Sequence, residues 1–143
     1  MKALIDTNVL LDVLLPREPW AAESKAVWDA ADAGTFEAYI SGVSFPNVFY
    51  IARKIIGIEK AHEAVRLLFD AFEVAPIDAS TVEAALVLKG SDFEDNLQIA
   101  SALASRADAL VTRDPKGLAN TRCQVLSPAE FLSRLASAQG SNP

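Results

Sequence analysis

The sequence predicts an α/β fold in which a central parallel sheet of four to five strands packs against helices. Short apolar runs, typical of buried strands, alternate with longer segments whose apolar residues recur at helical spacing. Strands that are joined through helices pair in parallel by right-handed crossovers. The 143 residues suit a single domain with one core. We expect this domain to span residues 1–136 and residues 137–143 to form a flexible tail.

The first strand is expected at residues 3–5 and the first helix at 9–15. The apolar run before Asp6 ends at this acid, and Thr7 and Asn8 both suit the start of a helix. Ligands of open parallel sheets bind at the carboxyl ends of the strands, so Asp6 is a candidate site residue. Taken alone, Asp6 is better explained as an acid that caps the helix, and only the positions of the other acids favour a site.

The remaining elements continue the alternation. Helices are expected over 20–31, 44–54, 59–72, 80–89 and 92–104 and from 128 onward, with strands over 36–40, 72–75, 108–112 and 124–126. Both tryptophans, Trp20 and Trp28, recur with apolar neighbours at helical spacing and are expected in the core. Ser44 is predicted to be the N-cap of its helix, because Pro46 follows in the first turn.

Composition excludes several classes of function. A single cysteine and a single histidine exclude a disulfide framework and a Cys/His zinc site. The sequence shows neither the apolar core of a signal peptide nor a run long enough to span a membrane, so a reducing, cytoplasmic location is expected. The net charge of −6 opposes nucleic-acid binding by bulk attraction. A phosphate substrate would therefore need metal-loaded acids or a local basic rim.

Acidic residues converge on one edge of the predicted sheet. Asp6 and Asp114 each follow a strand, and the helix opened by Asp92, Glu94 and Asp95 starts at the same edge. Acids at a helix N-terminus are favourable in themselves, which offers a purely structural explanation for residues 92–95. The full convergence, however, is repulsive unless a cation neutralises it. Carboxylates without histidine or cysteine favour Mg²⁺ or Mn²⁺, which can support phosphodiester hydrolysis.

Three motifs together resemble the PIN-domain family over residues 1–135. They are Leu4-Ile5-Asp6-Thr7-Asn8, Asp92-Phe93-Glu94-Asp95 and Val111-Thr112-Arg113-Asp114. The resemblance implies a three-layer α/β/α fold and a Mg²⁺- or Mn²⁺-dependent ribonuclease site. It also implies a homodimeric toxin of the VapBC type that is silenced by a small antitoxin. By position, Asp6, Asp95 and Asp114 match the catalytic, metal-binding acids of the family, whereas Thr112 and Asn8 match supporting polar residues.

One position departs from the family pattern. PIN nucleases usually carry a glutamate in the helix after the second strand, and Asn47 occupies that place here. Asparagine keeps an oxygen ligand but removes a negative charge, so metal should bind more weakly; Glu94 or Asp92 could compensate as extra acids. Alternatively, Asn47 simply fills the capping-box position three residues after Ser44.

Two basic residues flank Asp114. Arg113 and Lys116 could hold the phosphates of RNA at the rim of the site, although charged residues after a strand are often only solvated loop. Three functions are therefore compared: a metal-dependent ribonuclease, a catalytically weak PIN-like domain that binds RNA or protein, and an unrelated phosphoryl-transfer domain. The last fits worst, because Thr-Asn-Val follows Asp6 instead of the Asp-x-Asp-x-Thr of haloacid-dehalogenase-like phosphatases, and no receiver-type lysine is evident.

Overall fold

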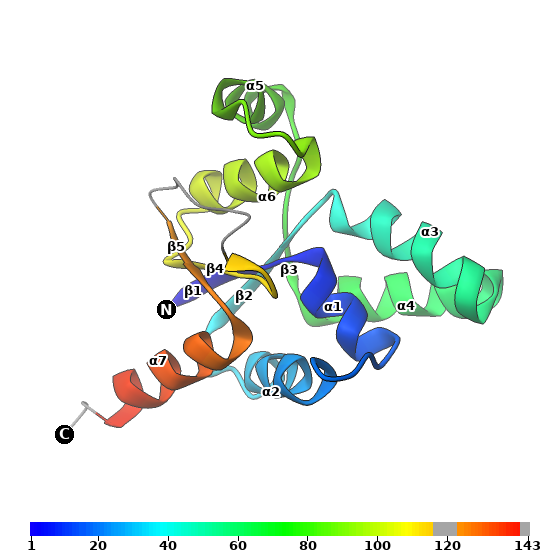
Figure 1. The fold of residues 1–143 in the computed structure, drawn as a ribbon, viewed down its shortest axis with the longest axis horizontal. Coiled ribbons are helices and arrows are strands. Elements are labelled where there is room, and N and C mark those ends of the chain that lie inside the picture. Colours follow the sequence, from blue (N-terminus) through cyan, green and yellow to red (C-terminus); the bar gives the residue numbers. More distant parts are fainter. Residues whose placement is uncertain (116–122, 141–143) are drawn as a thin grey trace.

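The computed structural model describes residues 1–115 and 123–140, and in this part of the chain five parallel strands form one sheet (Figure 1). The strands are β1 (Lys2–Ile5), β2 (Glu37–Ser41), β3 (Glu73–Ala75), β4 (Ala109–Val111) and β5 (Gln124–Leu126). The helices are α1 (Thr7–Leu14), α2 (Ala21–Asp32), α3 (Ser44–Ile56), α4 (Ile58–Ala71), α5 (Ala79–Leu88), α6 (Phe93–Ala104) and α7 (Pro128–Gly140). The predicted α/β fold with a parallel sheet is confirmed.

The strand order is β3-β2-β1-β4-β5, which places the N-terminal strand in the centre of the sheet. Leu4 is in register with Tyr39 of β2 on one side and with Leu110 of β4 on the other. At the carboxyl end of β1, the Asp6 N–H donates to the Val111 carbonyl oxygen over 2.9 Å. The two segments that leave β1 and β4 therefore emerge side by side.

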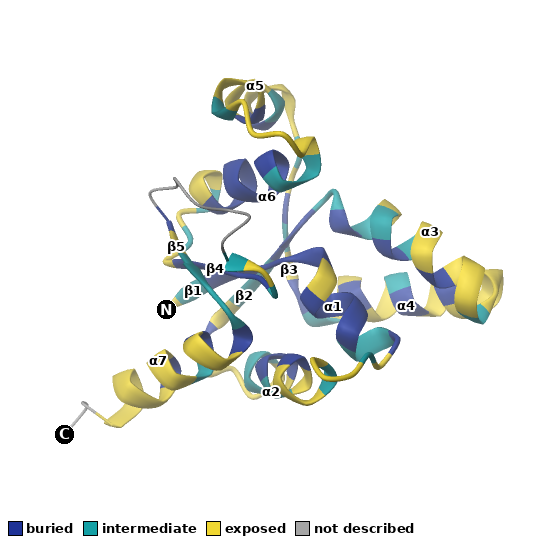
Figure 2. Cartoon of the chain, viewed as in Figure 1, coloured by how far each residue is buried: buried dark blue, intermediate teal, exposed yellow. Residues whose placement is uncertain are grey.

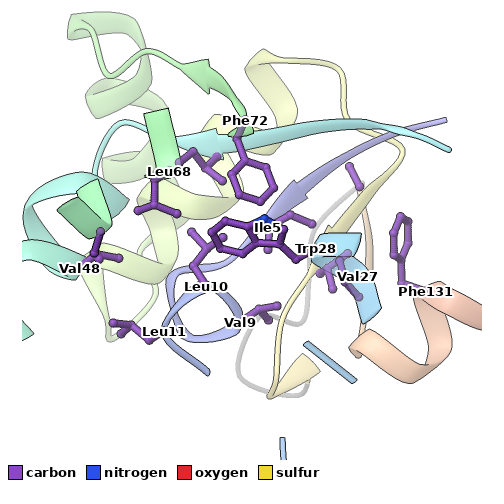
Figure 3. Close-up of a cluster of buried hydrophobic side chains, with 14 of the residues drawn as sticks. Ile5, Val9, Leu10, Leu11, Val27, Trp28, Val48, Leu68, Phe72 and Phe131 are labelled. Atoms are coloured by element: carbon purple, nitrogen blue, oxygen red, sulfur yellow. The ribbon is translucent and has the colours of Figure 1, made fainter. Parts of the chain in front are cut away.

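Side chains of β1 alternate between two apolar layers, as the pleat of a strand requires. Ala3 and Ile5 belong to the larger core, which also receives buried residues of α1, α2, α3, α4 and α7 (Figure 3). Leu4 faces the opposite side, where it belongs to a cluster with Ile99 and Ala102 of α6. Helix α5 in turn packs on α6. The result is the expected arrangement of helices on both faces of the sheet.

Of the two tryptophans that were predicted to lie in the core, one does and the other does not. Trp28 is 8% exposed and meets Phe72 edge to face, with 4.8 Å between the ring centroids. Trp20, in contrast, is 40% exposed. The prediction that both lie in the core is wrong for Trp20, because α2 begins one residue later and this side chain belongs to the preceding loop.

Side chains cap some helix starts, but Ser44 does not cap α3. Asp78 accepts from the Thr81 N–H over 3.0 Å, and Ser127 accepts from the Glu130 N–H over 3.1 Å, so both cap their helices. At α3 the N-cap is Val43, and the buried Ser44 hydroxyl bonds to other side chains instead. The prediction of a Ser44 N-cap is therefore wrong, because the Ser44 hydroxyl is hydrogen-bonded to Thr7 and Gln98.

Helices α3 and α4 form an arm that extends from the sheet and carries many exposed residues on its outer surface (Figures 1 and 2). Its exposed large apolar side chains are Tyr50, Ile51, Ile55, Ile58, Leu67 and Phe69. At the other end of the chain, α7 continues to Gly140, so the predicted boundary at residue 136 falls within this helix. None of the helices in residues 1–115 and 123–140 has the length and apolar character needed to cross a membrane.

Candidate active site

Asp6 lies at the carboxyl end of the central strand and is only 5% exposed. It occupies the N-cap position of α1, but its side chain makes no capping hydrogen bond, so capping does not explain it. Its Oδ2 instead accepts from the Thr112 hydroxyl over 3.1 Å. The same hydroxyl oxygen accepts weakly from the Asp114 N–H, at 3.4 Å. Thr112, predicted as a supporting residue, thus links the segments that carry Asp6 and Asp114.

The pKa of Asp6 is raised from its ordinary 3.8 to about 6, chiefly because an ionised carboxylate loses solvation at this depth. Repulsion from Asp95 and Glu94 contributes to this rise, whereas the hydrogen bond from Thr112 opposes it. Asp6 is therefore a carboxylate whose charge is costly in the metal-free protein, and a neighbouring cation would relieve that cost.

The N-terminus of α6 brings further acids to the same edge. Asp92 caps this helix by accepting from the Asp95 N–H over 3.2 Å. The pKa of Asp95 is also raised to about 6, first by burial and then by repulsion from Asp92, Glu94 and Asp114. The acids predicted from sequence to converge are thus close enough to repel one another. Glu94 and Asp95 are half-buried, and Asp92 and Asp114 are exposed.

The donor set is that of a hard divalent cation, because it consists of carboxylate oxygens. Within the two described stretches of the chain, no three acidic, histidine or cysteine side chains lie close enough to hold a metal ion. A large hollow of about 700 Å³ lies elsewhere, beside Glu37 and Glu73 at the amino ends of β2 and β3. It belongs to the opposite edge of the sheet from the acids.

A buried polar network lies next to the acids and was not predicted from the sequence. Gln98 is fully buried, and its Nε2 donates to the Thr7 hydroxyl over 3.0 Å and to the Ser44 hydroxyl over 3.3 Å. The two hydroxyls are themselves 2.9 Å apart. Thr7 follows Asp6, and Gln98 lies one turn after Asp95 on α6, so this network ties together the helix starts that carry the acids. The sequence signal for this network was Gln98 itself, a polar residue among apolar neighbours on α6.

Asn47 lies on α3, one turn after Ser44. Its backbone N–H donates to the Val43 carbonyl at 3.4 Å, and the Ser44 hydroxyl is taken by Thr7 and Gln98. The capping-box explanation of Asn47 is therefore wrong. Within residues 1–115 and 123–140, its side-chain Nδ2 is buried without a hydrogen-bond partner, as is the Oε1 of Gln98. Buried unsatisfied groups are uncommon and concentrate at functional positions.

Of the two basic residues predicted to line the rim of the site, Arg113 pairs with a buried acid. Arg113 Nη1 lies 3.0 Å from Oδ1 of Asp12, a fully buried acid of α1 that also pairs with Arg17 Nε at 2.8 Å. Sequence reasoning missed Asp12, although a lone charge in an apolar helix signals a buried partner. Lys116 lies outside the described residues. Asn8, the remaining candidate, is exposed on α1.

Comparisons with known proteins agree with this architecture. A family model described as PIN domain matches residues 2–116. Among solved structures, a toxin–antitoxin complex from Klebsiella pneumoniae is 24% identical, with a TM-score of 0.67 over 88% of this chain and 97% of that chain. VapBC-1 from nontypeable Haemophilus influenzae is 16% identical, with a TM-score of 0.69 over 90% and 99% of the two chains. VapC20 from Mycobacterium tuberculosis, a Sarcin-Ricin loop cleaving toxin, is 12% identical, with a TM-score of 0.67 over 80% and 92%. At such low sequence identities, these solved structures show that the fold is shared and nothing more. No curated protein matches the chain.

Proposed function

This chain belongs to the PIN-domain family, and on that premise we propose that it is a metal-dependent ribonuclease, the toxin of a type II toxin–antitoxin pair. The observation that carries the proposal is the acidic edge around Asp6. A buried carboxylate ends the central strand, and its burial, together with repulsion from Asp95 and Glu94, raises its pKa to about 6. A family member whose acids repel at this edge is suited to binding a divalent cation there.

We assign metal binding to Asp6, Asp95 and Asp114, with Glu94 and Asp92 as additional acids. Because no three of these side chains lie close enough to hold a cation in the described residues, cation binding has to draw the carboxylates closer together. When Mg²⁺ or Mn²⁺ is bound, it supplies an activated water and stabilises the departing oxygen of a phosphodiester. Thr112 holds the Asp6 carboxylate through its hydroxyl, and the network of Thr7, Ser44 and Gln98 fixes the helix starts. These contacts hold Asp6 in position and connect α1, α3 and α6 at this edge, which limits the rearrangement that remains when a cation binds.

RNA is the proposed substrate because the family resemblance implies it and because a solved relative of the same fold is a Sarcin-Ricin loop cleaving toxin. Asn47 supports the second candidate, a catalytically weak domain that binds RNA or protein. It places an amide where the family usually has a glutamate, and its buried Nδ2 is unpaired. An amide contributes no charge to metal binding, so the second candidate predicts weak metal affinity.

A protein partner is proposed for the α3–α4 arm. Exposed apolar side chains gather there, and a shallow hollow of about 280 Å³ is lined by Phe45, Phe49, Tyr50 and His62, among others. Contiguous exposed apolar surface commonly marks an interface. Toxin–antitoxin complexes and DNA-bound VapBC complexes occur among proteins of this fold, which supports a small antitoxin as one partner. A second copy of this chain is the other, and light scattering that shows only monomer at micromolar concentration would exclude it.

The proposed activity is tested by titrating Mg²⁺ and Mn²⁺ into the purified protein and measuring cleavage of single-stranded RNA. Calorimetry on the same samples measures metal affinity separately. Metal binding with metal-dependent cleavage, both lost in Asp6→Asn, is the expected result. RNA binding without cleavage at saturating metal would favour the second candidate, and absence of metal binding would overturn the assignment of the acids.

A further inference from the structure

Trp20 is an exposed aromatic side chain with a cation stacked on it. Trp20 is 40% exposed, and the Cζ atom of Arg113 lies 4.0 Å from the centroid of its ring. This contact places a planar guanidinium over the ring, at the separation of a cation–π pair. The proposed mechanism does not use Trp20, and its apolar surface contributes little to the core.

A buried aspartate holds the stacked pair in position. Asp12 is fully buried and accepts from Arg113 Nη1 at 3.0 Å and from Arg17 Nε at 2.8 Å. The backbone N–H of Trp20 donates to the Arg17 carbonyl oxygen over 3.0 Å. Asp12 therefore fixes the guanidinium on the ring and anchors the turn that carries Trp20. A surface prepared in this way loses little conformational freedom when it binds a flat ligand.

The stacked pair also adjoins the acidic edge. Arg113 lies in sequence between Thr112, which bonds to Asp6, and Asp114. Two guanidinium groups share the single carboxylate of Asp12, so both arginines bring donors to this spot in a chain of net charge −6. An aromatic ring with a stacked guanidinium beside the proposed cleavage site matches the chemistry of unpaired nucleotides, whose bases stack and whose phosphates need cations.

We propose that Trp20 and Arg113 form a stacking platform for an unpaired base of single-stranded RNA close to the scissile phosphate. The inference rests on the proposed function for its substrate class. It makes single-stranded RNA the preferred ligand, because the bases of a duplex are already stacked and cannot reach the ring.

Tryptophan fluorescence tests the platform directly. All proteins in the comparison carry Asp6→Asn so that RNA stays intact, and a short single-stranded oligoribonucleotide is titrated with Mg²⁺ present. We expect RNA to quench fluorescence in the parent and in Trp28→Phe, which retains Trp20, but not in Trp20→Phe. Trp20→Leu should weaken RNA binding about tenfold, the typical value of one stacked base. Duplex RNA of the same sequence should quench much less.

Two controls separate the possible failures. Circular dichroism checks that Trp20→Leu and Trp28→Phe are folded. Trp20→Phe serves as the milder change if Trp20→Leu is not folded, and the parent alone supplies the Trp20 signal if Trp28→Phe is not. Quenching that persists in Trp20→Phe, equal quenching by duplex, or unchanged affinity in Trp20→Leu would overturn the platform. If the protein with Asp6 intact cleaves RNA without a Trp20 response, only the platform fails. If Trp20 responds but no metal-dependent cleavage occurs, only the ribonuclease proposal fails.

Discussion

Replacing Asp6 by asparagine should stabilise the metal-free protein at neutral pH. The substitution removes a buried charge with almost no change in shape, and an amide oxygen can still accept from the Thr112 hydroxyl. The rise in the Asp6 pKa from 3.8 to about 6 corresponds to about 3 kcal/mol of unfavourable free energy once the carboxylate is ionised. We therefore expect the free energy of unfolding of Asp6→Asn to exceed that of the parent by about 3 kcal/mol above pH 7.

The difference in stability between the parent and Asp6→Asn should depend on pH. A carboxyl group whose pKa is raised by folding binds protons more tightly in the native state, so its protonated form favours folding. The parent should lose stability as pH rises from about 4 through about 6, whereas Asp6→Asn should lose less over that window. The two proteins should be equally stable near pH 4 and below.

Urea unfolding in EDTA across pH 4 to 8 provides the measurement, with circular dichroism as the signal. Added Mg²⁺ should then stabilise the parent more than the mutant, because a ligand favours the state that binds it. A mutant that is less stable than the parent at pH 7.5, or a difference that does not vary with pH, would refute the argument that Asp6 carries a costly buried charge. Equal Mg²⁺ shifts would remove Asp6 from the metal ligands.

Three further substitutions test other parts of the structure. Asn47→Glu should tighten Mn²⁺ or Mg²⁺ binding in calorimetry, and it should lower the metal-free melting temperature because it adds a like charge. Asn47→Gln is the uncharged control. A higher metal-free melting temperature without a change in metal affinity would contradict this prediction. Asp12→Ala should cost about 3 kcal/mol in urea unfolding because two arginines lose a buried partner. Asp29→Ala, which removes an exposed pair with Lys25, should cost less than about 1 kcal/mol, and equal losses would contradict the difference in burial. Leu68→Ala, at a fully buried position of α4, should cost about 3 kcal/mol in the same assay, and a loss below about 1 kcal/mol would show that the core relaxes around the gap.

The layout of the sheet could be predicted because its signals are local. An apolar run that stops at Asp6, and another that stops before Asp114, mark strand ends without any knowledge of the tertiary structure. Parallel pairing then brings these ends to one edge, as the bond from the Asp6 N–H to Val111 shows. The acids at the start of α6 follow from the same topology.

The details that sequence reasoning missed depend on contacts between distant segments. Ser44 has the local chemistry of an N-cap, but Thr7 and Gln98 engage its hydroxyl across the core. Trp20 has helical spacing, yet it lies just before α2 and stacks with Arg113, which is more than ninety residues later in the chain. Local propensity cannot foresee such partners, because tertiary context overrides it.

The central position of β1 has a consequence for the order in which the protein is made. The strand that leaves the ribosome first is flanked in the finished sheet by β4, whose residues 109–111 are synthesised late. Until those residues emerge, β1 lacks a neighbour on one side, and Asp6 lacks the Thr112 hydroxyl. Pairing over such sequence separation is slow, because the intervening chain must first be ordered. The acidic edge therefore assembles only after nearly the whole domain has been translated, and a chain that stops before Ala109 cannot complete it.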